Sequence, residues 1–565
     1  MFAEEKILVG CNENTGVFLL PKMANRHGVI AGATGTGKTV TLKVLAESFS
    51  DLGVPVFLAD MKGDVSGLAK VGSGNDFITK NREKYGLDAK GFKFKEYPVE
   101  FWDLFGEKGL PVRVTLSEMG PVLLSKILNL SEAQAGVLNI IFRVADEHSL
   151  PIIDLKDLKS MINYVVENKG QFESQYGAIA EKSANTILRS LIALEAQGGN
   201  DFFGEPALEL NDFMQLDDNG CGVINVLDAQ KLSLSPEIYS TFLLWMLCEL
   251  FEKLPEVGDM EKPKLVFFFD EAHLLFDDMS PEFGKKIEQV VRLIRSKGVG
   301  IYFISQSPAD IPDDILAQLG NRIQHALRAY TPKDQKAVKV AAETFRPNPN
   351  FDTAEVISNL GTGQALVSVL DENGAPTVVE QVDIVPPQSH IGAIEDDLRN
   401  QLIGISTLKS KYSEAFDAES AYERLLTKID ENPNIESEVA PEVLEEVKAQ
   451  TQQQAPEPQE EAPEQPQQPG AADVIGGILG TVLAGQQQTP EPQEETPQQP
   501  QQPGAVDVIG GILGTVLAGQ QQTKRRKTRK TTTEKVVEKA ATQAATTVTR
   551  EVTKGIMRGL FGNMK

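Results

Sequence analysis

The residues most suited to chemistry lie in a glycine-rich segment that ends in a lysine and a threonine. An apolar run at 27–31 precedes this segment, a helical pattern at 40–48 follows it, and its residues are Gly32, Ala33, Thr34, Gly35, Thr36, Gly37, Lys38 and Thr39. Between a strand and a helix, the backbone N–H groups of such a loop wrap phosphate groups, and the positive end of the helix dipole assists them. The segment predicts a site for ATP and Mg²⁺, with Lys38 on the β- and γ-phosphates and the Thr39 hydroxyl on the metal.

A second candidate lies much further along the chain, where an apolar run ends in two acids. Residues 265–269 read Leu-Val-Phe-Phe-Phe, and Asp270 and Glu271 follow them. An unbroken apolar run is typical of a strand buried on both faces, which delivers its terminal carboxylates to the carboxyl edge of a parallel sheet. We expect Asp270 to hold Mg²⁺ through its water shell and Glu271 to act as general base on the attacking water. The pair therefore predicts ATP hydrolysis.

Two further polar residues end apolar runs that should reach the same edge. Gln306 follows the run at 300–305, and it either senses the γ-phosphate and positions water or only bonds its own loop. Asp60 follows the run at 54–59. It either orients the metal's water shell or a neighbouring subunit, or it closes its own turn.

Arginine fingers stabilise the charge that develops on a transferring phosphoryl group, but most arginines on helices face solvent. Arg292 and Arg295 lie on the predicted helix before residue 300, and Arg322 and Arg328 lie just beyond residue 305. We predict that Arg295 and Arg328 are the catalytic arginines.

Short apolar runs alternate with helical patterns up to about residue 400, which predicts an α/β fold with a mainly parallel sheet and crossover helices. The candidate strands are His27–Ala31, Val54–Ala59, Val112–Thr115, Gly222–Val226, Leu265–Phe269, Gly300–Ser305 and Ala365–Leu370. The predicted divisions are the first part of the core at 1–118, a helical insertion at 119–204, the second part of the core at 205–400 and a C-terminal helix at 401–430.

Beyond these divisions, residues 431–523 are rich in Pro, Gln and Glu, which predicts a disordered linker. This linker contains a tandem repeat with an offset of 34 residues, and each copy is either an interaction segment or a neutral duplication. Residues 524–565 form a basic tail with a possible amphipathic helix. The tail could bind DNA, an acidic protein partner, an anionic membrane surface or the acidic body of the chain, or it could simply be solvated.

Composition narrows the class of protein. The 565 residues carry a net charge of −25 and include only three cysteines and five histidines without metal-ligand spacing, so we expect no disulfide scaffold or zinc site. We see no signal peptide and no transmembrane segment, which predicts a cytoplasmic protein. The acidic body disfavours broad adhesion to nucleic acid but leaves room for a basic channel within a ring.

Taken together, the motifs resemble those of the HerA/FtsK group of P-loop ATPases, and more narrowly its YjgR-type HerA-like branch. The carrying segments are GATGTGKT at 32–39, DMKGD at 60–64, LVFFFDEAH at 265–273, RSKGVGIYFISQSP at 295–308 and GNRIQHALRAYTPKDQKAV at 320–338. The resemblance implies a RecA-like αβα core, ATPase activity, a homohexameric ring and DNA translocation. It also implies nucleotide-site roles for Lys38, Thr39, Asp270, Glu271 and Gln306, and a role for Arg295 in completing a neighbour's site.

Two functions from different classes follow. The first is an oligomeric ATPase that translocates DNA in a helicase-like manner. The alternative is an ATPase that remodels or scaffolds protein partners through its C-terminal tail, without DNA translocation. DNA-stimulated ATP turnover distinguishes the two hypotheses.

Overall fold

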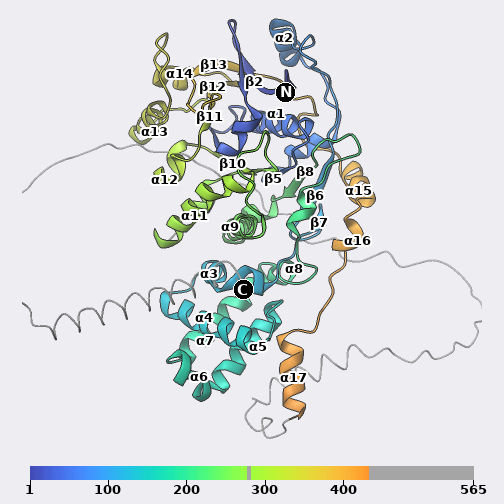
Figure 1. Cartoon of the computed structure of the whole chain (residues 1–565), viewed down its shortest axis with the longest axis vertical. Coiled ribbons are helices and arrows are strands. Elements are labelled where there is room, and N and C mark those ends of the chain that lie inside the picture. The colour runs from blue at the N-terminus through green and yellow to red at the C-terminus, as the bar shows by residue number, and fades with distance from the viewer. Residues whose placement is uncertain (277–280, 432–565) are drawn as a thin grey trace, which may run out of the picture. The chain divides into compact units, whose positions relative to one another are not determined.

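The computed structural model describes residues 1–276 and 281–431, which are coloured in Figure 1. The described residues belong to one compact unit. The linker predicted from residue 431 onward and the basic tail predicted for 524–565 lie outside the described residues, apart from residue 431 itself.

Within the described residues, thirteen strands form one sheet in the order β1-β2-β13-β12-β11-β4-β10-β9-β5-β8-β6-β7, with β3 paired to β2. Neighbours from β11 to β7 are all parallel, whereas β12, β13 and the N-terminal β1 to β3 pair in antiparallel fashion. The strands are β1 (Phe2–Ala3), β2 (Lys6–Cys11), β3 (Gly16–Leu19), β4 (Gly28–Ala31), β5 (Val56–Asp60), β6 (Val99–Asp103), β7 (Leu110–Pro111), β8 (Ile224–Asp228), β9 (Leu265–Phe269), β10 (Val299–Ser305), β11 (Asn321–Gln324), β12 (Gln364–Ser368) and β13 (Glu380–Ile384).

The central strands are buried on both faces, which explains their mostly apolar sequences. Every residue of β4, β5, β8, β9 and β10 is buried. Along β4, Val29 and Ala31 join one hydrophobic cluster, whereas Ile30 joins another that includes residues of the helix after β4. Because successive side chains of a strand point to opposite faces, the sheet has a packed helical layer on each face. The predicted α/β class with a mainly parallel sheet is confirmed.

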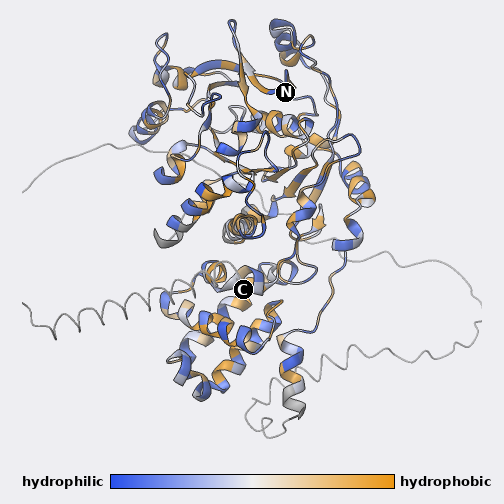
Figure 2. Ribbon diagram, in the orientation of Figure 1, coloured by the Kyte–Doolittle hydropathy of each residue, from blue (hydrophilic) through white to orange (hydrophobic). Residues whose placement is uncertain are grey.

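Helices cover both faces of the sheet and form the inserted segment (Figure 1). Those of the core are α1 (Lys38–Asp51), α2 (Asp76–Tyr85), α9 (Pro236–Lys253), α10 (His273–Phe276), α11 (Pro281–Ile294), α12 (Asp313–Leu316), α13 (Pro332–Glu343) and α14 (Thr353–Asn359). The insertion predicted for 119–204 corresponds to α3 (Leu116–Ile127), α4 (Glu132–Glu147), α5 (Leu155–Glu167), α6 (Lys169–Tyr176), α7 (Glu181–Ala196) and α8 (Gly199–Phe202). Helix α9 contacts α3 and α11, is buried throughout 238–250 and is mostly orange in Figure 2.

The strand prediction is wrong at one place and incomplete at others. Residues 112–115 do not form a strand: they lead into α3, where the Thr115 hydroxyl accepts the N–H of Glu118 at 3.2 Å. The nearest longer strand is β6, whose sequence VEFWD mixes charged and apolar residues and lacks an unbroken apolar run, and the two-residue β7 ends at Pro111. The run predicted at 365–370 forms β12, which is antiparallel to β11. Strands β1 to β3, β7, β11 and β13 were also not predicted.

The segment after β13 returns across the core and carries three helices, α15 (Asp396–Ile405), α16 (Lys409–Tyr412) and α17 (Ala421–Glu431), in place of the single helix predicted for 401–430. Glu47 of α1 is fully buried and anchors this segment, accepting the N–H groups of Gln388 at 2.8 Å and Ser389 at 3.0 Å. Further on, the N–H of Ala421 donates to the carbonyl of Pro151, just before α5. The C-terminal segment therefore ties the helix after the glycine-rich loop to the helical insertion.

Asn225 in the middle of β8 generates a stability prediction. Its buried amide accepts from Trp102 Nε1 at 3.0 Å and donates to the carbonyls of Phe213 at 3.1 Å and Val56 at 3.2 Å. Asn225→Ala leaves these buried groups without their partner, so we expect the free energy of unfolding to fall by about 3 kcal/mol. Denaturant titration measures this change. The exposed Asn373→Ala is the control, and equal midpoints for both variants would contradict the prediction.

Candidate active site

The glycine-rich loop connects the end of β4 to the start of α1. Gly32, Gly35 and Gly37 have φ values of 156°, 77° and 114°, which side-chain-bearing residues rarely adopt. A Cβ on Gly32 would also lie 2.5 Å from the Cβ of His325. The loop therefore needs glycine for both conformation and space, and it ends at the N-terminus of a 14-residue helix, a suitable cradle for phosphate oxygens.

Lys38 is folded back along this loop. Its Nζ donates to the carbonyl of Gly32 at 2.5 Å and to that of Ala33 at 3.3 Å. Burial lowers the pKa of Lys38, while the charges of Glu271 and Asp270 act to raise it. The charges of both carboxylates therefore act on this ammonium. Thr39 follows as the second residue of α1 and is half-buried.

Asp270 directly follows β9 and is held by local hydrogen bonds. Its backbone carbonyl accepts the hydroxyl of Tyr239 at 2.8 Å, and its Oδ1 accepts the N–H of Glu271 at 2.9 Å. Burial, reinforced by the charge of Glu271, raises the pKa of Asp270 to about 6, and the charges of Lys62 and Lys38 oppose the rise. The sequence did not assign Lys62, which adds a second cation at this edge.

Glu271 combines two features that are costly for a purely structural residue. Its φ is 47°, in the left-handed region that non-glycine residues seldom occupy. Its Oε2 is buried and has no hydrogen-bond partner among the described residues, although His273 Nδ1 lies 3.4 Å away. Buried carboxylate oxygens are almost always satisfied. An oxygen left open beside Lys38 fits the role of accepting a proton from a bound water.

The strand order explains how Gln306 reaches this site. Strand β10 lies between β4 and β9, with Ser305 level with Ala31 and Phe303 level with Phe269. Gln306 therefore leaves the sheet between the glycine-rich loop and the two carboxylates, and its side chain is exposed there. The Ser305 hydroxyl donates to Asp310 at 2.6 Å, and the charge of Asp310 also acts on Lys38. Asp310 is a second residue that the sequence did not single out.

His325 packs against the glycine-rich loop, and the sequence did not single it out. Its Nδ1 lies 3.0 Å from the carbonyl of Gln364, and its Nε2 lies 2.9 Å from the hydroxyl of Thr41. These partners fit a neutral ring that donates through Nδ1 and accepts through Nε2. Burial lowers its pKa to about 4, which keeps it neutral near pH 7. The segment at 320–338 contains this residue, but no local pattern distinguishes a supporting histidine from a ligand-binding one.

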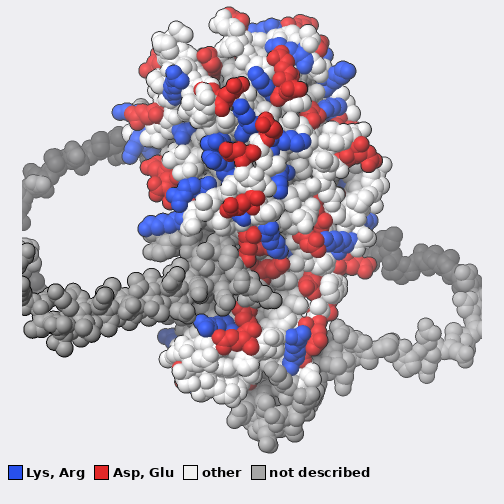
Figure 3. Space-filling model, viewed as in Figure 1, with Lys and Arg blue, Asp and Glu red and all other residues white. Residues whose placement is uncertain are grey.

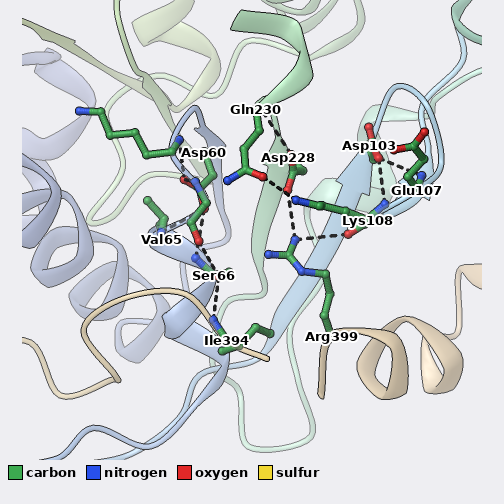
Figure 4. Close-up of polar contacts among 12 residues, drawn as sticks. Asp60, Val65, Ser66, Asp103, Glu107, Lys108, Asp228, Gln230, Ile394 and Arg399 are labelled. Carbon is green, nitrogen blue, oxygen red and sulfur yellow. Dashed lines mark hydrogen bonds and ion pairs between the residues drawn. The ribbon is translucent and has the colours of Figure 1, made fainter. Parts of the chain in front are cut away.

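Asp60 closes its own turn, one of the two roles left open by the sequence. Three neighbouring strands end level with one another in Asp60, Asp228 and Asp103 (Figure 4). Asp60 accepts four backbone N–H groups at 2.7–3.3 Å, those of Lys62, Gly63, Val65 and Ser66. Burial raises its pKa to about 6, and these bonds counteract the rise. The carboxylate is thus fully used in shaping the loop next to the site.

The two predicted arginines lie at opposite ends of the parallel strands, Arg328 at the carboxyl edge of the sheet and Arg295 at the amino edge. Arg328 follows β11 at the same edge as the glycine-rich loop, where it donates to the carbonyls of Ser358 at 3.1 Å and Leu360 at 3.4 Å. Arg295 lies just before β10, at the edge where the parallel strands begin. The structure therefore separates Arg295 from the nucleotide site of its own chain.

Arg295 lines a basic pocket of about 600 Å³ together with Arg26, Arg292 and Arg322. The described residues around this pocket include no carboxylate. Arg322 is fixed by three carbonyls at 2.9–3.0 Å, those of Leu316, Leu319 and Thr344. Among the described residues, no carboxylate pairs with Arg26, Arg295 or Arg322. The pocket therefore presents uncompensated positive charge suited to an anion.

This geometry is that of a P-loop nucleotide-binding fold: a glycine-rich loop and a strand-end pair of carboxylates meet at one edge of a parallel sheet, with one strand between them. The chain belongs to the family described as Helicase HerA-like C-terminal, whose model matches residues 5–483. The predicted membership of the HerA/FtsK group is confirmed.

Curated relatives carry helicase names. A probable helicase of Methanocaldococcus jannaschii is 24% identical over 354 residues, which cover 61% of this chain and 60% of the relative. The DNA double-strand break repair helicase HerA of Sulfolobus acidocaldarius is 23% identical over 380 residues, covering 64% of this chain and 65% of the relative. The chain thus spans less than two thirds of the length of either protein.

Similar solved structures include those of a plasmid coupling protein. TrwB in complex with a non-hydrolysable ATP analogue is 14% identical, with a TM-score of 0.46 and coverage of 68% of this chain and 90% of that one. VirB4 of Thermoanaerobacter pseudethanolicus is 14% identical, with a TM-score of 0.42 and coverage of 67% and 96%.

None of the helices in residues 1–276 and 281–431 is both long enough and apolar enough to span a bilayer.

The buried His325 generates a prediction about pH. An unfolded histidine titrates near pH 6.5, whereas burial lowers the pKa of folded His325 to about 4. Its stabilising contribution is therefore complete above about pH 6.5 and is lost as the pH falls toward 4, at up to about 1.4 kcal/mol per pH unit. We expect His325→Gln to reduce the number of protons taken up on unfolding between about pH 4 and 6.5 by about one. The slope of the free energy of unfolding against pH measures this number. The exposed His148→Gln is the control, and identical slopes for all three proteins would contradict the prediction.

Proposed function

We propose that this chain is an ATP-hydrolysing motor that acts on DNA as a homohexameric ring. The observation that carries the ATPase part is the open, buried Oε2 of Glu271 beside Lys38 and Asp270. The DNA part rests on the family and on the relatives' names, which describe helicases. Acidic and basic side chains are interspersed over the face seen in Figure 3. Such a face favours DNA contact within an assembly over adhesion to an extended basic surface.

The residues fit the substrate and its metal. The glycine-rich loop and Lys38 bind the β- and γ-phosphates, while Thr39 and Asp270 are the residues to hold Mg²⁺. The loop's lack of side chains and its position at a helix N-terminus suit polyphosphate, and the carboxylate and hydroxyl oxygens suit a hard cation. When bound, Mg²⁺ neutralises charge on the phosphate oxygens.

Glu271 supplies the base for hydrolysis. Its carboxylate accepts a proton from water as the water oxygen bonds to the γ-phosphorus, while the bond from that phosphorus to the β,γ-bridging oxygen breaks and ADP leaves. Gln306, at the end of β10, orients this water. Lys38 stabilises charge on the departing diphosphate. The catalytic role of Arg328 stays a prediction. Its guanidinium donates to carbonyls at 358–360 and forms no hydrogen bond with the described residues that are proposed to bind the phosphates.

The experiment measures ATP turnover with and without duplex and single-stranded DNA at low salt. We expect turnover that DNA stimulates and that added salt returns to the basal rate, since salt weakens phosphate contacts. Glu271→Gln should lower turnover about 100-fold or more while ATP still binds. The exposed Glu256→Gln should match the wild type. Turnover indifferent to DNA would refute the DNA motor and favour the alternative of a protein-remodelling ATPase acting through the tail.

We further propose that Arg295 acts on the nucleotide of a neighbouring subunit. Its basic pocket lies at the edge opposite its own glycine-rich loop, and no described carboxylate lines it. Contact between the basic edge of one chain and the phosphate-binding edge of the next is head-to-tail, and a closed series of such contacts forms a ring. The arrangement gives Arg295 a phosphate to stabilise that its own chain cannot supply.

Mixing two inactive variants tests this arrangement. Arg295→Gln should lower turnover at least about 100-fold, because a positive charge next to the transferring phosphoryl group is lost. A mixture with Glu271→Gln should recover about a quarter of wild-type turnover, because random assembly restores that share of interfaces. Arg189→Gln in the insertion is the control. Normal turnover by Arg295→Gln, or no recovery on mixing, would exclude the role across the interface.

A further inference from the structure

The sheet order fixes the direction in which a bound nucleotide must extend. Asp270 and Glu271 follow β9, which lies beyond β10 on one side of β4. These carboxylates act at the γ-phosphate end of the nucleotide. Because the triphosphate is a linear chain, its nucleoside end leaves the glycine-rich loop on the other side, toward β11, β12 and β13.

The loop before β12 forms the wall on that side. The N–H of Gly363 donates to the carbonyl of Thr36 at 3.0 Å. A Cβ on Gly37 would lie 3.2 Å from the nitrogen of Gly363. The two loops therefore touch through bare backbone, and no side chain separates the phosphate-binding loop from what lies beyond Gly363.

Beyond Gly363 lies the aromatic ring of Phe77. A Cβ on Gly363 would lie 3.1 Å from the Cζ of this ring. Phe77 is the second residue of α2 and is 52% exposed. A single exposed phenylalanine needs no explanation in itself. Phe77 is a candidate for binding because only Gly363 separates it from the phosphate-binding loop, on the side where the nucleoside is expected.

The position of Phe77 is fixed by a shared carboxylate. Asp383 on β13 accepts from Lys84 Nζ at 3.1 Å and from the Tyr85 hydroxyl, both at the end of α2. The other oxygen of Asp383 accepts from Gln364 Nε2 at 3.0 Å. At its start, α2 is capped by Asn75, whose Oδ1 accepts the N–H of Ile78 at 2.9 Å. Helix α2 and the loop that ends at Gln364 are therefore held together, which presets the ring against Gly363.

We propose that Phe77 is the platform on which the base of the bound nucleotide stacks. An aromatic ring held with about half of its surface open offers the apolar face that a base needs, and the glycine beneath it lets the ring pack directly against the loop before β12. Stacking depends on ring area and not on hydrogen-bonding groups, so this subsite favours purine over pyrimidine nucleotides without separating adenine from guanine. The proposal rests on ATP binding at the glycine-rich loop.

The test compares ligands with and without a base. For Phe77→Ala we expect the KM for ATP to rise about tenfold with little change in kcat, because stacking is lost while the phosphate contacts remain. The dissociation constant of inorganic tripolyphosphate, which has no base, should not change. Phe416→Ala is the matched control, since Phe416 is a similarly exposed phenylalanine elsewhere (59% exposed).

Phe77→Trp supplies a second readout. The native Trp102 and Trp245 are both fully buried, so the introduced indole is the solvent-accessible tryptophan side chain. We expect ATP and GTP to quench it and tripolyphosphate to leave it unchanged, with the KM for ATP close to that of the wild type.

Two outcomes would overturn the proposal: an unchanged KM for ATP in Phe77→Ala, or equal losses of affinity for ATP and tripolyphosphate, which indicate a structural role. A wild-type protein that binds neither ligand would instead refute the proposed function.

Discussion

The parallel pairing of β4, β10 and β9 is the constraint on which the site depends. Because Ser305 is level with Ala31 and Phe303 with Phe269, the segments after these strands leave the sheet side by side. A shift of one residue would turn every side chain of a strand to the opposite face. The complete burial of these strands makes such a shift very costly, since both faces are packed against helices. The apolar core thus sets the distance between Lys38 and Glu271.

The residues that support the site differ from the residue proposed to react in how fully their polar atoms are hydrogen-bonded. Asp60 spends its carboxylate on four backbone N–H groups, His325 has a partner on each nitrogen, and Glu47 is used by residues 388 and 389. These groups hold the loop and its helix in place. Glu271 differs because a buried oxygen remains open and its backbone is strained. In a well-packed protein such costs are retained where a ligand or a reaction uses them.

The two edges of the sheet carry complementary chemistry. One edge holds the phosphate-binding loop and the carboxylates, and the other holds a basic pocket without a described carboxylate. In the proposed ring each chain supplies one half of two sites, which couples hydrolysis in one subunit to the conformation of the next. Phe77 extends the first half toward the nucleoside, so that phosphates, metal and base would each meet a different element of the fold.

Local patterns in the sequence were sufficient for the α/β class, the glycine-rich loop, Asp270 and Glu271, because buried parallel strands and phosphate-binding turns require short, recognisable runs of residues. The sequence did not reveal β6, since its residues mix polar and apolar types and pair with β8, far along the chain. It also missed the N-terminal strands, although β2 and β3 are mostly apolar, and β2 joins the sheet through the distant β13. It could not decide whether Asp60 closes a turn or serves the metal. It also could not reveal that Arg295 lies at the far edge, that His325 supports the loop, or that Phe77 adjoins Gly363. Those outcomes were decided by the tertiary structure alone, because they depend on strand order and on contacts between residues far apart in the chain.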